Sequence, residues 1–170
     1  MSKSAKKISR RDLTLIIVTV ALLIVLAIAF VYDSNNLLFN RTSQFELTQD
    51  MKIVQMDKHG MMFYRRGYEC QISIPIDKMD GIATMIAQEY NFAGQVMDYD
   101  EYMTMASEVL NAQAMLPTPA EGSNVWVMSV RTPDDHDITY IIDQETETSA
   151  FLYVIRDKHF YKNSKLMLTY

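Results

Sequence analysis

The sequence LTLIIVTVALLIVLAIAFVY, which occupies Leu13–Tyr32, decides how the rest of the chain is organised. Its twenty residues include no charged residue, no Pro and no Gly, and two Thr are its polar members. An α-helix rises about 1.5 Å per residue, so a helix of this length matches the ~30 Å hydrocarbon layer of a bilayer. A single helix can cross that layer because its backbone hydrogen bonds close internally. The stretch therefore predicts one transmembrane helix over residues 13–32, in contact with the lipid bilayer.

The charges on the two sides of this stretch are unequal. Residues 1–12 carry five cations and one anion, whereas residues 33–170 carry eleven cations and twenty anions. Because cations gather on the cytoplasmic side of membrane helices, residues 1–12 are expected to be a basic cytoplasmic tail and the rest to be extracytoplasmic. This describes a single-pass protein of a cell membrane. The acidic larger part repels phosphate groups, so no nucleic-acid partner is expected.

A cleaved signal peptide is the alternative interpretation of the same stretch. Ala27-Ile28-Ala29 has the small–x–small pattern of a cleavage site after Ala29. The apolar run nevertheless continues to Tyr32 without a helix breaker, which favours a retained anchor. The single Cys70 cannot form an internal disulfide, and an exported domain without disulfides is more typical of bacteria than of animal secretory proteins.

Residues 44–170 have the length of one folded domain. Residues 33–43, DSNNLLFNRTS, are expected to be a polar linker whose Leu37, Leu38 and Phe39 lie at the membrane interface or pack under the domain. The clearest strand runs from Tyr68 to Ile76, because apolar and polar residues alternate along it. Pro75 cannot donate a ladder hydrogen bond, so this strand is expected to lie at an edge or to leave the sheet there.

Further strands and two helices follow from the same patterns. Helices are expected from Asp80 to Phe92, with Gly94 as the stop, and from Asp98, where Asp98-Tyr99-Asp100-Glu101 resembles a capping box. Short turns between strands predict an antiparallel sheet. The fold class is therefore α+β, a single domain with two consecutive helices packed on one face of the sheet. The other expected strands cover residues 45–53, 61–64, 125–130, 138–142, 150–155, 159–161 and 166–170, with early turns at 57–60 and 65–67.

Cys70 is the first candidate for chemistry, as a nucleophile with His59, His136 or His159 as its base. It shares a strand face with Ile72, however, and that face is expected to pack in the core. A small buried hydrophobic residue is the favoured interpretation, because apolar surroundings raise the pKa of a thiol.

Acidic clusters are the second candidates. Asp134-Asp135-His136-Asp137 offers four metal-ligating side chains, but it lacks the offsets and the Gly of a calcium loop, so a solvated turn is favoured. Asp98, Asp100 and Glu101 are explained by helix capping. No phosphate loop, HExxH or Ser-elbow pattern occurs. We therefore expect no catalytic residue, no bound metal and no cofactor.

The ten Tyr and thirteen Met are the least usual feature of the composition. Met adapts to varied partners, and Tyr combines a flat apolar ring with a polar tip. Those near the predicted junction between the helices are a candidate partner surface, although core packing is the favoured explanation, because a stripe at helical spacing usually faces the sheet. The candidate residues are Tyr90, Met97, Tyr99, Tyr102 and Met103.

The resulting functional hypothesis is a membrane-anchored extracytoplasmic interaction domain that binds a protein or peptide partner without catalysis. Edge strands, such as the one ending at Pro75 or residues 166–170, are places where a partner strand would pair. One alternative is a small-ligand sensor or carrier domain with a pocket between helices and sheet. Another is a hydrolase or metalloenzyme that uses His136 or Cys70. The layout of tail, anchor and small domain recurs in many single-pass bacterial proteins and by itself indicates no function.

Overall fold

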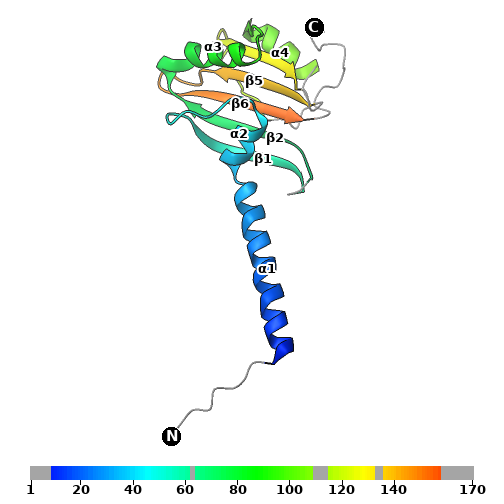
Figure 1. Ribbon diagram of the computed structural model, residues 1–170. Coiled ribbons are helices and arrows are strands. Elements are labelled where there is room, and N and C mark those ends of the chain that lie inside the picture. Colours follow the sequence, from blue (N-terminus) through cyan, green and yellow to red (C-terminus); the bar gives the residue numbers. More distant parts are fainter. Residues whose placement is uncertain (1–8, 62–63, 109–114, 133–135, 158–170) are drawn as a thin grey trace.

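The computed structural model describes residues 9–61, 64–108, 115–132 and 136–157, which form an α+β fold (Figure 1). The helices are α1 (Arg10–Tyr32), α2 (Asn35–Thr42), α3 (Met79–Glu89) and α4 (Tyr99–Glu108), and a short 3-10 helix (Ile76–Lys78) precedes α3. The strands are β1 (Lys52–Met61), β2 (Tyr64–Ile74), β3 (Gln95–Asp98), β4 (Asn124–Arg131), β5 (Asp137–Asp143) and β6 (Ala150–Asp157).

Helix α1 contains the whole apolar stretch and is about 35 Å long, which is enough to cross a membrane. Ser9 caps its N-terminus, because the Ser9 hydroxyl accepts a hydrogen bond from the Asp12 N–H and the Asp12 carboxylate accepts one from the Ser9 N–H. Ala29 is its one buried residue. Length and composition of this kind are shared by membrane anchors and signal sequences.

The six described strands form one open antiparallel sheet in the order β1-β2-β6-β5-β4-β3. β1 and β2 form a hairpin, whereas β3 to β6 are paired in chain order and β6 returns to pair with β2. In Figure 1 the strands run across the view, and β1, β2, β6 and β5 lie successively farther from α1. β1 is therefore the edge nearest the apolar helix, and β3 is the edge farthest from it.

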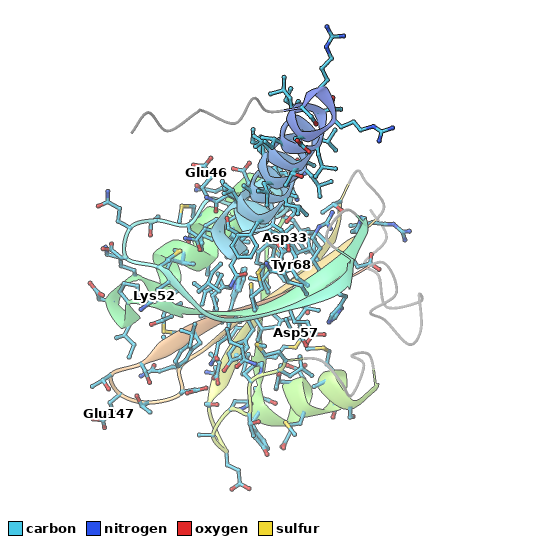
Figure 2. All side chains as sticks on the ribbon, turned by 90° about the horizontal axis from the view of Figure 1, so that it is seen from below. Asp33, Glu46, Lys52, Asp57, Tyr68 and Glu147 are labelled. Atoms are coloured by element: carbon cyan, nitrogen blue, oxygen red, sulfur yellow. The ribbon has the colours of Figure 1, made fainter. Side chains whose placement is uncertain are left out.

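The two faces of the sheet carry two separate clusters of buried side chains, which we call the α3 face and the α4 face. Even-numbered residues of β2, β4, β5 and β6 join the first cluster with α2 and α3, whereas odd-numbered residues of β4, β5 and β6 join the second with α4. Figure 2 shows α4 across the sheet from α1. The prediction that both helices pack on one face is therefore wrong. Strands β4 and β6 are apolar on both faces, so each face needs its own helix.

The stretch interpreted from sequence as a polar linker, residues 33–43, forms helix α2 on the α3 face. Leu38 and Phe39 are 1% and 0% exposed, so these two residues pack under the domain as expected. An ordered helix replaces the linker, because burying two adjacent apolar side chains fixes the backbone that carries them. The chain thus passes from α1 into the core within a few residues.

Three predicted strands in the second half of the chain are confirmed as β4, β5 and β6. The predicted turns at 57–60 and 65–67 are wrong, because β1 and β2 run through both segments. The register of β1 shifts between Ile53 and Gln55 and again between His59 and Gly60, and such bulges disrupt the period-2 pattern. β3 was not predicted from the sequence. The strand expected at 45–53 begins only at Lys52, because residues 45–51 precede the sheet. The strands expected at 159–161 and 166–170 lie outside the described residues.

Helix α3 ends at Glu89, before the predicted stop at Gly94. Asn91 adopts a left-handed conformation with φ 50°, and the Phe92 N–H donates to the Ala87 carbonyl at 2.9 Å. This is a Schellman cap in which Asn takes the place that Gly usually holds. The cap turns the chain toward β3.

Candidate functional site

The residues predicted to line a partner surface do not all lie together. Tyr102 is fully buried under α4, where its hydroxyl donates to the Pro117 carbonyl at 3.1 Å. Tyr90 packs on the α3 face, and its hydroxyl donates to the Ser43 carbonyl. Because these two tyrosines lie on opposite faces of the sheet, they do not line one groove.

The other three predicted residues gather at the sheet edge farthest from α1. We call Gln95–Met103, which comprises β3 and the first half of α4, the distal edge. Met97 in β3 and Tyr99 at the start of α4 are half-buried, and Met103 lies one helical turn after Tyr99 with 39% of its surface exposed. Val96, which sequence analysis did not single out, is 67% exposed. The distal edge thus presents apolar side chains to solvent.

Two local interactions hold the distal edge in place. Asp98 is the N-cap of α4, because its carboxylate accepts a hydrogen bond from the Glu101 N–H at 2.9 Å. This confirms the capping role predicted for Asp98. At the other end of β3, the indole of Trp126 lies where a side chain on Gly94 would begin, so the absence of a Cβ lets β3 approach β4. Trp126 pairs directly with Val96 in the sheet.

The distal edge is also uniformly acidic. Between Lys78 and Arg131 the sequence contains no Lys, no Arg and no His, but it contains seven Asp and Glu. This stretch supplies α3, β3, α4 and β4. Its field therefore favours cationic over anionic partners. The exposed acids of the stretch are Asp80, Glu89, Asp98, Asp100, Glu101 and Glu121.

A buried carboxyl lies on the α4 face at the end of β5. Asp143 is 0% exposed, and neither of its carboxylate oxygens accepts a hydrogen bond within the described part of the chain. Burial raises the pKa of Asp143, and the Glu145 carboxylate adds to the increase. The nearby N–H of Gln144 partly offsets it without reaching hydrogen-bond geometry. Burial therefore favours the neutral form of this carboxyl.

Neighbouring polar side chains on the α4 face are hydrogen bonded to one another. The Tyr153 hydroxyl donates to Glu145 Oε1 at 2.8 Å and accepts from Gln71 Nε2 at 3.0 Å. Burial raises the pKa of Tyr153, so the hydroxyl remains a donor. The three groups link β2, β6 and the loop before β6. Their arrangement is explained by packing of the sheet.

A second buried carboxylate lies on β2. Glu69 is 5% exposed, His59 Nε2 lies 3.2 Å from Glu69 Oε1, and the Met115 N–H donates to Glu69 Oε2. These contacts join β1, β2 and the segment that follows α4. A buried carboxylate needs partners of this kind, so the group is accounted for by structure.

The catalytic candidates are not assembled in the described part of the chain. Cys70 is 1% exposed on the α3 face, and burial raises the pKa of its thiol. His59 extends toward Glu69 on the α4 face, away from this thiol. His159, Asp134 and Asp135 lie outside the described residues. Among the residues that are described, no three His, Cys, Asp or Glu side chains gather where they would hold a metal ion. Cys70 is thus placed as a small core residue.

Comparisons with protein families, with curated proteins and with solved structures find no significant match for this chain. The candidate site therefore rests on the residues of the chain itself. Sequence reasoning found Met97, Tyr99 and Met103 but missed Val96, because a four-residue strand is too short to show period-2 alternation. The stretch from 79 to 130, which contains no cation, is the sequence feature that could have indicated this region.

Proposed function

We propose that this chain is a membrane-anchored, extracytoplasmic interaction domain that presents its distal edge to a protein partner and carries out no catalysis. In this proposal α1 stays in the bilayer, residues 1–12 remain in the cytoplasm, and the sheet stands outside. The unequal flanking charges support that orientation.

Retention of α1 is supported by the way its C-terminal end continues into the domain. The helix runs without a break past Ala29 to Tyr32, and α2 follows after two residues. The Arg41 guanidinium of α2 stacks 3.8 Å from the centroid of the Tyr32 ring, and Lys58 Nζ of β1 lies 3.7 Å from Asp33 Oδ2. Both contacts lie after Ala29 and fix the end of α1 on the domain, so the feature that supports retention is the apolar helix that runs unbroken through the small–x–small site.

The observation that carries the proposal is the junction between α2 and the domain core. The Ser43 carbonyl, just after α2, accepts hydrogen bonds from the hydroxyls of half-buried Tyr90 and buried Tyr140, the latter at 2.6 Å. The Thr42 hydroxyl donates to the Tyr68 hydroxyl at 3.2 Å. A domain fixed to its anchor in this way holds β1 toward the membrane and the distal edge away from it. Such a geometry suits the presentation of a surface to other proteins.

The two alternative functions receive less support. A carrier pocket between helix and sheet would need space there, but Ile82 and Ile86 of α3 and Tyr102 of α4 are at most 3% exposed where they meet the sheet. A hydrolase using Cys70 would need a reactive thiol, and burial acts against one.

Photocross-linking in native membranes tests the proposal. A photoreactive amino acid replaces Met103 at the distal edge, Val54 on β1, or Leu22 within α1, each in the full chain. We expect a discrete protein adduct from the Met103 position, and lipid adducts from the Leu22 position. Recovery of a soluble mature chain that begins near Phe30, a C-terminal half protected inside the cytoplasm, or no protein adduct from any exposed position would refute the proposal.

A further inference from the structure

The two edges of the sheet differ in how well they are protected against pairing with another strand. β1 carries Lys52 and Lys58, contains two register shifts, and lies next to α1. Lysines, bulges and covering elements are the features that keep natural edge strands from pairing. β3 has no Lys, no Pro and no register shift, and among the described strands β4 is its one neighbour. Within the part of the sheet that the structure describes, the distal edge is therefore the one without these protections.

Apolar side chains flank this open edge on both faces. Val96 and half-buried Trp126 lie together on the α3 face. Met97 packs on the α4 face, with Tyr99 and Met103 of α4 following it in the chain. Side chains of an added strand would point alternately to the two faces. They would meet apolar neighbours on each.

The charge around the edge restricts which strand would pair there. Exposed Asp98, Asp100 and Glu101 lie at or just after the end of β3, and no cation occurs anywhere from 79 to 130. A second copy of this chain pairing edge to edge would bring two acidic edges together, which is unfavourable. A strand rich in Lys or Arg would be attracted instead.

We infer that β3 is the acceptor edge for an extended, basic segment of a partner protein, which adds to the sheet as a further strand. This inference rests on the proposed interaction function and names the site and the chemistry of the partner. Backbone hydrogen bonds to β3 supply affinity, and alternate apolar side chains contact Val96 on one face and Met97 on the other. The acidic surroundings supply selection for positive charge.

Peptide binding to the full chain in neutral detergent micelles tests this inference. The probe is a short fluorescein-labelled peptide that alternates Lys and Val, and fluorescence anisotropy reports its binding. Two control peptides carry Glu in place of every Lys, or N-methyl groups on alternate backbone nitrogens that block strand pairing. We expect saturable binding of the Lys peptide that weakens as salt rises from about 50 to about 500 mM, and no binding of either control.

Two matched variants locate the site, because Val96 and Val54 are exposed valines on the two opposite edges of one sheet. Val96→Lys should weaken binding of the Lys peptide by roughly tenfold or more, since a like charge then stands at the edge. Val54→Lys should leave binding unchanged. Circular dichroism and the emission of Trp126, the sole Trp of the chain, verify that both variants are folded.

Each contrary result overturns the inference. These are no binding of the Lys peptide, equal binding of the Glu or N-methylated peptide, equal loss in the two Val variants, or dimerisation of the chain that Val96→Lys abolishes. If the Lys peptide does not bind while the Met103 position still cross-links to a protein, the interaction function stands and the basic-strand inference falls. The two failures are therefore distinguishable.

Discussion

At the scale of single residues, packing is close where β3 meets β4. A Cβ on Gly94 would overlap ring atoms of Trp126, so something would have to shift to make room for it. Gly81 of α3 is the opposite case, because a Cβ there meets nothing within 4 Å. The two glycines therefore have different roles in one domain.

Gly94→Ala should lower the free energy of unfolding by about 1–3 kcal/mol, because the indole of Trp126 must move to make room. Gly81→Ala, the matched control, should raise it by about 0.5–1 kcal/mol through helix propensity. Urea titration in micelles, followed by the emission of Trp126, measures both. An unchanged stability for Gly94→Ala would contradict the tight approach of β3.

Asp143 should make stability depend on pH. Burial raises the pKa of this carboxyl in the folded state, so the folded protein holds the proton more tightly than the unfolded chain. The resulting stabilisation is present below the unfolded pKa and is lost as pH rises through the higher folded pKa. Asp143→Asn cannot lose that proton, so its stability relative to the parent should increase from pH 4 to pH 7. Denaturant titrations of both proteins across this range test the sign.

At the scale of elements, α3 shows how a local cap directs the chain. Tyr90, Asn91 and Phe92 turn out of the helix, and Phe92 packs against the core of the α3 face. Asn tolerates a φ of 50° better than most residues, although Gly tolerates it better still. At this position Asn therefore has a higher backbone energy than Gly would have, but a lower one than most other residues.

Asn91→Gly should raise the free energy of unfolding by about 0.5–1 kcal/mol, and Asn91→Val should lower it by about 1–2 kcal/mol, because a β-branched residue is strained at positive φ. Thermal unfolding followed by circular dichroism at 222 nm measures the order of the three proteins. A Val variant as stable as the parent would mean that the cap contributes nothing.

At the scale of the whole molecule, the two parts of the domain sequence differ in charge, and hydrogen bonds at Ser43 connect them. Residues 33–66, which include α2 and β1, carry five cations and four anions, whereas residues 67–170 carry six cations and sixteen anions. The acidic residues of the domain are thus concentrated in the part of the sequence that follows β1. The hydrogen bonds at Ser43 join the two regions, because they connect the end of α2 to α3 and β5.

Tyr90→Phe and Tyr140→Phe should each lower the free energy of unfolding by about 0.5–1.5 kcal/mol, since one hydroxyl still donates to the Ser43 carbonyl. The two hydroxyls also lie 2.7 Å apart within hydrogen-bond distance, so their effects are coupled and the loss in the double variant should differ from the sum of the single losses. Tyr99→Phe is the control and should change stability by less than about 0.5 kcal/mol. Strictly additive losses would show that the two hydroxyls act independently.

Much of this architecture was readable from the sequence, because it depends on local periodicity and composition. The apolar length of residues 13–32 predicts α1, period-2 alternation predicts the second half of β2, and short apolar runs between turns predict β4, β5 and β6. The acidic N-cap predicts the start of α4. Of the candidate site, Met97, Tyr99 and Met103 were predicted from composition, and their role in binding stays a prediction. The burial of Cys70 followed from the strand face that it shares with Ile72.

Only the tertiary structure decided which face each helix covers, that Gln95–Asp98 forms the distal edge strand, and that residues 35–42 are a helix within the core. Periodicity records which side of an element is apolar, but it does not record which neighbour covers that side. β3 pairs with β4 across a separation of about thirty residues, and a segment of four residues becomes a strand only because that pairing exists. The edge proposed for partner binding is therefore a product of long-range contact, whereas the apolar helix α1 is a property of the local sequence.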